Sequence, residues 1–317
     1  MRIISDNNSR ARLKIKGFIP KKFKNFVKKL KNKKPEFSKI ELLGNRLRGM
    51  SLIRESKSFT LQCNGYFADV HLTNSKKIVV TFESGGFVKD GASHREAWGG
   101  GYFRHKDISY IGIKPTSNNW YVSPPLEDFL NSLKFILEQY EDVLTYGSSM
   151  GAFAALTYAD HLGATKVIAF CPQSSRHPVI CPWEKPLSKD VARLDVNNKF
   201  TDAVGNYANA KSVYIFADFY FQRDRLHAQR LAGPNVIMIN TPFIGHATPM
   251  YLNPLGLLMD IPMAVLDDTF DANEFYKKFR RRRELKKYYR TLEAKAAKRP
   301  HFMEIINRHK KNGKLGS

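Results

Sequence analysis

Several features that mark whole classes of protein are missing from this sequence. Its 317 residues contain no run of about eighteen apolar residues, whereas a helix that spans a bilayer needs roughly twenty. The chain has only three cysteines, Cys63, Cys171 and Cys181, too few for a disulfide framework and without the spacing of a metal site. No apolar segment follows the basic N-terminus, so we recognise no secretory signal. These absences predict a cytoplasmic protein that binds no metal and no other cofactor.

Acidic residues are also scarce, and the resulting charge is unevenly distributed. The chain has 52 Lys and Arg against 29 Asp and Glu, a net charge of +23. Residues 1–34 carry a net charge of +12 and residues 277–317 carry +13, so the residues between them are close to neutral. This asymmetry predicts an anionic partner for the two ends of the chain and not for the middle.

The N-terminal segment shows the pattern of a basic amphipathic helix. Between residues 17 and 30, aromatic and aliphatic residues recur at three- and four-residue spacing, with lysines filling most of the other positions. Such a helix can lie on an anionic membrane surface, which would place the protein at the inner face of the membrane. Alternatively, its apolar side packs on the protein's own core and its lysines are solvated. The sequence leaves both readings open.

From about residue 35 the pattern becomes that of an α/β protein. An Asn64-Gly65 pair predicts a hairpin. An amphipathic helix is expected over residues 126–140, and a further helix is expected near residues 225–232. Strands are expected at residues 58–63, 66–72, 77–82, 108–113, 166–170, 212–217 and 235–240, and directly before Gly147. Strands that alternate with helices indicate a mostly parallel sheet covered on both faces. We therefore expect a basic arm (1–34), an α/β domain (35–268) and a basic helical extension (269–317).

The most informative motif is the G-x-S-x-G sequence at residues 147–151, between a short apolar strand and a helix rich in small residues. A tight strand-to-helix turn is strained, and Gly147 and Gly151 supply positions without side chains. Ser149 is then held at the tip of the turn, beside a helix N-terminus that favours a developing oxyanion. This is the pattern of a nucleophile elbow. A glycine-rich turn in some other α/β fold is the alternative.

A serine nucleophile needs a base, and the base needs an acid to orient it. In a parallel sheet these groups lie just beyond the carboxyl ends of strands. His246 follows the last predicted strand. Asp218 and Asp224 both follow the strand before it, but Asp224 directly precedes a predicted helix, where N-capping would explain an aspartate. We therefore favour Asp218 as the acid and keep Asp224 as the alternative.

An oxyanion hole needs two N–H donors, one of them from the residue after the nucleophile. Met150 occupies that position. The second donor is expected from the loop after the strand at 77–82, where Gly86 is the candidate. An ordinary Gly-Gly turn would also explain the Gly85-Gly86 pair.

The order Ser149, Asp218, His246 is that of nucleophile, acid and base in the α/β-hydrolase fold. Residues 77–260 resemble an α/β-hydrolase-fold serine enzyme, which implies an acyl-enzyme at Ser149. The segment Asn118-Asn119-Trp120-Tyr121 and the basic helical tail are also similar to bacterial α/β-hydrolase-fold proteins associated with surface polysaccharides. That weaker resemblance implies an acyl group moved onto or removed from a glycan.

These patterns predict a serine hydrolase acting on an ester or related acyl substrate, with residues 88–106 and 172–200 as the cap and pocket segments. One alternative is an acyltransferase, such as an O-acetyltransferase, acting on a surface polysaccharide. A second is a non-catalytic fold whose basic ends bind an anionic membrane surface or a polyanionic glycan. Nucleic acid is less favoured as a partner, because the core is near neutral and no nucleic-acid motif is present.

Overall fold

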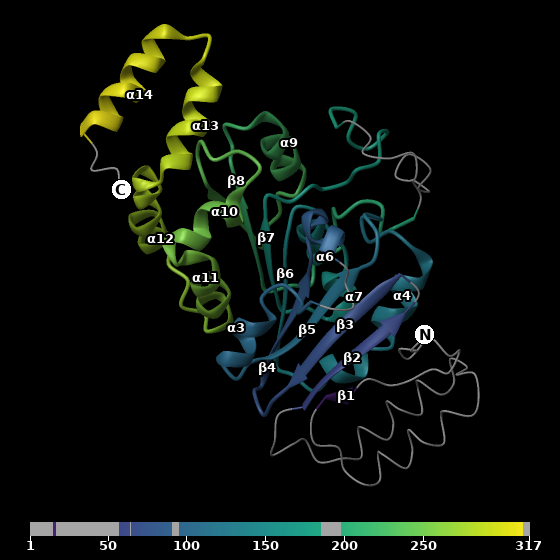
Figure 1. Cartoon of the computed structure of the whole chain (residues 1–317). Helices are drawn as coiled ribbons and strands as arrows, with labels where there is room; N and C mark the ends of the chain where they lie inside the picture. Colours follow the sequence, from purple (N-terminus) through teal and green to yellow (C-terminus); the bar gives the residue numbers. More distant parts are fainter. Residues whose placement is uncertain (1–14, 17–56, 64, 91–94, 185–197, 313–317) are drawn as a thin grey trace, which may run out of the picture.

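The computed structural model describes residues 15–16, 57–63, 65–90, 95–184 and 198–312. Within these residues, nine strands form one sheet in the order β1-β2-β3-β5-β4-β6-β7-β8-β9 (Figure 1). The strands are β1 (Ile15–Lys16), β2 (Lys57–Cys63), β3 (Tyr66–Leu72), β4 (Lys77–Phe82), β5 (Ser109–Pro115), β6 (Asp142–Ser148), β7 (Lys166–Phe170), β8 (Ser212–Ala217) and β9 (Val236–Asn240).

The larger part of the sheet is parallel. Strands β5, β4, β6, β7, β8 and β9 pair in parallel, while β1, β2 and β3 form an antiparallel edge that joins the rest through β3 and β5. All five residues of β7 are buried, as expected for a parallel strand covered on both faces. The predicted α/β architecture is confirmed, and the predicted bounds of β3, β4, β7 and β8 agree with the structure.

Helices cover both faces of this sheet (Figure 1). One apolar cluster joins the sheet to α4 (Pro124–Asn131), α5 (Lys134–Leu137), α6 (Met150–Thr157), α7 (Ala159–Leu162) and α9 (Gln222–Arg230). A second cluster joins the sheet to α3 (Gly100–His105), α10 (Thr248–Leu252), α11 (Leu257–Leu266), α12 (Ala272–Phe279), α13 (Lys286–Ala296) and α14 (Pro300–Asn312). Short 3-10 turns are η1 (Gly85–Asp90), η2 (Asn253–Leu255) and η3 (Arg280–Glu284).

Two helix predictions need correction. The single helix expected over residues 126–140 is two helices, α4 and α5, which are separated at Ser132 and Leu133. The Ser132 hydroxyl donates to the Phe129 carbonyl at 2.6 Å, a local bond that competes with regular helical pairing. The helix expected near 225–232 begins earlier, at Gln222.

The C-terminal segment is helical, as predicted, and its apolar side chains belong to the core. The ring of Phe216 in β8 lies 5.8 Å from that of Phe270 and 5.4 Å from that of Phe275. The predicted N-terminal amphipathic helix and Asn64 of the predicted hairpin lie outside the described residues. Within the described part, no single helix has the length and apolarity to cross a membrane, although α10–η2 and α11, bent by 93°, together meet both criteria.

Candidate active site

The turn after β6 has the geometry of a strained strand-to-helix connection. Ser149 has φ 53° and ψ −116°, a conformation that non-glycine residues rarely adopt, and α6 begins at the next residue. A Cβ added to Gly147 would lie 2.2 Å from the Gly151 carbonyl oxygen, and one added to Gly151 would lie 2.0 Å from that of Phe82. Both positions therefore require glycine, and the turn presents Ser149 at its tip.

Three side chains from separate parts of the chain meet at this turn. Ser149 Oγ lies 2.9 Å from His246 Nε2, and His246 Nδ1 lies 2.7 Å from Asp224 Oδ1. Because an ionised carboxylate only accepts hydrogen bonds, Nδ1 carries the ring proton and Nε2 accepts the Ser149 hydroxyl. Asp224 is buried, whereas 32% of the His246 side chain is exposed. The arrangement matches that of a nucleophile, a base and a group that orients the base.

The preference for Asp218 as the partner of His246 does not agree with this geometry. Asp218 is fully buried, and its two oxygens accept the backbone N–H groups of Tyr220, at 3.0 Å, and Gly245, at 2.7 Å. Asp218 thus holds the loop that carries His246 and does not contact the ring. N-capping also fails as the explanation of Asp224, since Phe221 is the N-cap and Asp224 lies in the first turn of α9. There the helix N-terminus stabilises a carboxylate.

The two residues expected to supply oxyanion donors line the cavity that Ser149 enters. Met150 begins α6 and Gly86 lies in η1, and both line the same cavity as Ser149. The loop that carries Gly86 is fixed by Glu83, a buried carboxylate that pairs with Arg95 and accepts the Trp98 backbone N–H at 3.3 Å. Burial raises the pKa of Glu83, and the Arg95 guanidinium opposes that effect.

The cavity above Ser149 has a volume of about 860 Å³. Trp98, from the predicted cap segment 88–106, lines it, as do Gln173, Arg176 and Glu184 from the predicted segment 172–200. Residues 185–197 of that second segment lie outside the described residues. The remaining residues that line the cavity include Asn118, Trp120, Cys171, Phe221, Arg223, Pro249, Met250 and Leu258.

A buried ion pair in the cavity wall was not predicted from the sequence. Arg176 pairs with Glu184, and both side chains are only 4% exposed. The Arg176 guanidinium lies 5.1 Å from the centre of the Trp120 ring, in a cation–π contact. Burial alone would raise the pKa of Glu184, but the contacts of its carboxylate with His227 and Arg176 hold that pKa below its ordinary value. The charges of Arg176 and Glu184 therefore compensate each other inside the cavity wall.

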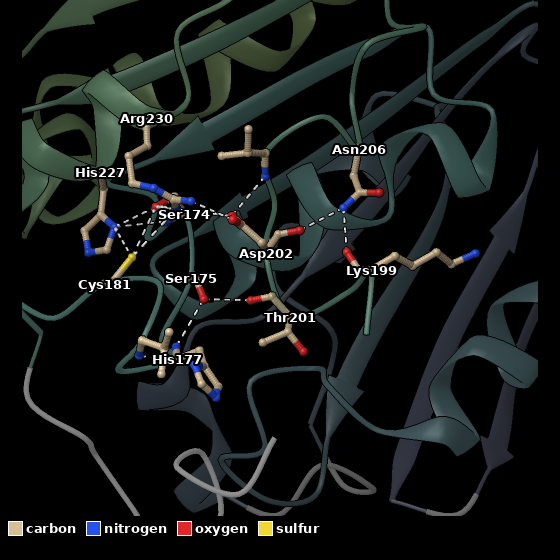
Figure 2. Close-up of polar contacts among 12 residues, drawn as sticks. Ser174, Ser175, His177, Cys181, Lys199, Thr201, Asp202, Asn206, His227 and Arg230 are labelled. Carbon is tan, nitrogen blue, oxygen red and sulfur yellow. Dashed lines mark hydrogen bonds and ion pairs between the residues drawn. The ribbon is translucent and has the colours of Figure 1, made fainter. Parts of the chain in front are cut away.

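Helix α9 anchors the segment that carries this ion pair. His227 Nδ1 accepts the backbone N–H of Ser174 at 3.0 Å, and its Nε2 donates to Glu184 at 3.3 Å. Arg230 donates to the Ser174 hydroxyl at 2.7 Å and pairs with Asp202 at 2.6 Å. Figure 2 shows His227 and Arg230 at Ser174, with Asp202 on the other side of Arg230. Since Asp224, His227 and Arg230 recur every three residues, one side of α9 carries both the carboxylate that contacts His246 and the side chains that hold the cavity wall.

Two other kinds of chemistry receive no support from the described residues. No group of three or more His, Cys, Asp or Glu side chains among them is placed to hold a metal ion. Cys171 lines the cavity, but burial raises its pKa to about 12. A thiol with that pKa stays protonated at neutral pH and is a poor nucleophile.

Comparison with known proteins shows similarity of structure without a match in sequence. No protein-family model matches the chain, and no curated protein matches it. Among solved structures, a hormone-sensitive lipase from a metagenome library aligns with a TM-score of 0.50 and 12% identity, covering 80% of this chain and all of the lipase. Together with the strand order and the elbow, this similarity establishes the α/β-hydrolase fold.

Two further solved structures are similar at lower scores. An esterase from the archaeon Pyrobaculum calidifontis has a TM-score of 0.46 and 14% identity, covering 74% of this chain and 92% of the esterase. A capsule O-acetyltransferase of Neisseria meningitidis serogroup A has a TM-score of 0.45 and 14% identity, covering 66% of this chain and 96% of that protein.

Proposed function

We propose that the protein is a serine hydrolase that cleaves an ester or related acyl bond through a covalent intermediate at Ser149. The observation that carries this proposal is the continuous hydrogen-bond chain from Ser149 through His246 to Asp224 at the wall of a cavity. Backbone strain at a serine is typical of functional sites, and a histidine oriented by a buried carboxylate is what activates a serine as a nucleophile. A non-catalytic protein of this fold would not require this combination.

In the proposed mechanism, Ser149 Oγ attacks the substrate carbonyl carbon as His246 Nε2 takes the hydroxyl proton. Asp224 stabilises the imidazolium, and the backbone N–H groups of Met150 and Gly86 stabilise the oxyanion. His246 then gives the proton to the leaving oxygen, and the C–O bond to that oxygen breaks, which leaves an acyl group on Ser149. Water, deprotonated by His246, attacks the acyl-enzyme in the same way and restores the serine.

The acceptor of the acyl group is the second element of the proposal. Water gives the hydrolase, whereas a glycan hydroxyl attacking the same intermediate would give the acyltransferase that the sequence resemblance suggested. Both outcomes share every step up to the acyl-enzyme. Analysis of the products formed with and without an added polysaccharide separates them.

The direct test is labelling with a fluorophosphonate probe, with p-nitrophenyl acetate turnover measured in parallel. We expect labelling and turnover in the wild-type protein and neither in Ser149→Ala. Ser148→Ala is a matched control, because Ser148 lies in the same turn but its hydroxyl contacts Cys171 Sγ at 3.7 Å. If folded wild-type protein is not labelled, or if Ser149→Ala keeps its turnover, the proposal is wrong.

A further inference from the structure

A second hollow, of about 670 Å³, lies on the C-terminal segment around η3. The described residues that line it are Pro242, Asn273, Tyr276, Lys277, Phe279, Arg280, Arg282 and Arg283. Four of these side chains are cationic and none is acidic. A concave surface lined by charge of one sign concentrates the field and attracts ions of the opposite sign.

Arg282 is the buried member of this group. Only 7% of the residue is exposed, and its guanidinium lies over the rings of Phe279, at 4.5 Å, and Tyr288, at 5.3 Å. Its Nη1 donates to the Phe279 carbonyl at 3.2 Å, while its Nε has no hydrogen-bond partner in the described part of the chain. The guanidinium is therefore fixed in place with a donor unused.

The charge of Arg282 also has no counter-ion among the described residues. Among the described residues, no carboxylate lies within ion-pair distance of it, although Arg281, its neighbour in sequence, pairs with Glu284 at 3.3 Å. Asp218 acts on Arg282 only from beyond that distance, and it is bonded to backbone N–H groups and lies 3.4 Å from Lys295. Burial lowers the pKa of the Arg282 guanidinium. A buried charge without a partner is costly, and a bound anion would remove that cost.

We propose that this hollow binds a phosphate group carried by an organic molecule, with Arg280, Arg282 and Arg283 as donors to the phosphate oxygens. Phosphate offers several oxygens and more than one negative charge, and arginine is the side chain that matches this geometry best. Tyr276 and Phe279 provide an apolar wall for the rest of the ligand. A lipid headgroup and a soluble phosphorylated compound share this chemistry. The residues that line this hollow are not among those that line the cavity above Ser149.

The first test is calorimetric titration of the full chain with inorganic pyrophosphate. The double variant Arg280→Gln/Arg283→Gln removes two exposed cations of the hollow without touching the core, and we expect it to bind at least about tenfold more weakly than wild type. Arg281→Gln is the matched control, because Arg281 belongs to the same turn but does not line the hollow. Equal affinity of the double variant and the wild type, or no saturable binding by the wild type, would overturn the proposal.

A second titration examines Arg282 itself. Arg282→Lys keeps the positive charge but loses the planar fork, so we expect weaker pyrophosphate binding with an unchanged far-UV circular dichroism spectrum. Unchanged affinity in a folded Arg282→Lys protein would remove Arg282 from the site. If this variant does not fold, the double variant at Arg280 and Arg283 still decides the proposal.

Co-sedimentation with vesicles distinguishes the two sources of phosphate. Wild type and the double variant are compared on phosphatidylcholine vesicles with and without phosphatidic acid. Loss of binding to the phosphatidic acid vesicles in the double variant assigns the hollow to a lipid headgroup. Retained vesicle binding, together with weakened pyrophosphate binding, assigns it to a soluble phosphorylated ligand. If neither measurement responds to the double variant, the hollow is not a phosphate site.

Discussion

The cavity above Ser149 and the basic hollow around η3 each contain a buried arginine that lies over an aromatic ring. Arg176 is 5% exposed and Arg282 is 7% exposed. They differ in their partners: Arg176 pairs with Glu184, whereas no carboxylate among the described residues pairs with Arg282. Burial of an unpaired charge costs several kcal/mol. In the wall of the cavity above Ser149, Glu184 removes that cost for Arg176. An arginine left uncompensated points to a counter-ion from outside the chain.

In the cavity above Ser149, the buried carboxylate of Asp224 has one partner from the chain itself. Its Oδ1 accepts from His246 Nδ1 at 2.7 Å, whereas its Oδ2 has no hydrogen-bond partner among the described residues. The His246 ring is thus oriented by a group of the chain, and no bound ion is needed for that role. The hollow around η3 has four cations and no acid in its wall, so a bound anion would neutralise charge that the described residues do not.

The largest effect is expected from breaking the internal pairing at the reacting centre. Asp224→Asn removes the acceptor that fixes the His246 tautomer, and we expect kcat for p-nitrophenyl acetate to fall about 10⁴-fold. Asp218→Asn is the matched comparison, because Asp218 holds the backbone of Gly245 and does not contact the ring. Its kcat should fall far less, by about tenfold. A larger loss in Asp218→Asn than in Asp224→Asn would reverse our assignment of the acid.

A smaller effect, on stability, distinguishes the two buried arginines. Arg176→Met leaves the Glu184 carboxylate buried without its guanidinium, and we expect a loss of about 3–5 kcal/mol in the free energy of unfolding. Arg282→Met leaves no carboxylate behind and should cost no more than about 1–2 kcal/mol, from lost ring contacts and one hydrogen bond. Urea denaturation of both variants measures the difference. Equal losses would show that Arg282 has an internal counter-charge after all.

Much of the fold could be predicted because its signals are local. Buried parallel strands such as β7 are short apolar runs, and the chain order of the strands limits how they can pair. The break between α4 and α5 was not predicted, because it involves a hydrogen bond from the Ser132 hydroxyl to the Phe129 carbonyl of α4. The elbow was predicted from its motif, and one of the two glycine contacts is local: a Cβ on Gly147 would meet Gly151, whereas a Cβ on Gly151 would meet Phe82 from another strand.

The partners of the site residues were harder to predict, because they depend on tertiary placement. Asp218 and Asp224 are six residues apart, and local sequence patterns do not indicate which of the two contacts His246. The pairing of Arg176 with Glu184 depends on how α9 holds the intervening segment through His227. Sequence composition did show that the C-terminal segment is rich in cations, but not that Arg282 is buried among rings.

Salt should affect ligand binding at the hollow around η3 more than ester turnover at Ser149. This test needs no substitution, and its expected effect is the smallest. Raising the ionic strength from about 0.05 M to 0.5 M shortens the Debye length to a few ångströms, so attraction between exposed cations and an anionic ligand is largely screened. We expect the dissociation constant for pyrophosphate to rise about tenfold over this range. Turnover of p-nitrophenyl acetate, a neutral ester, should change less than about twofold, because its reacting groups are paired within the chain. Parallel salt dependence of the two measurements would mean that long-range charge, and not internal pairing, governs turnover at Ser149 as well.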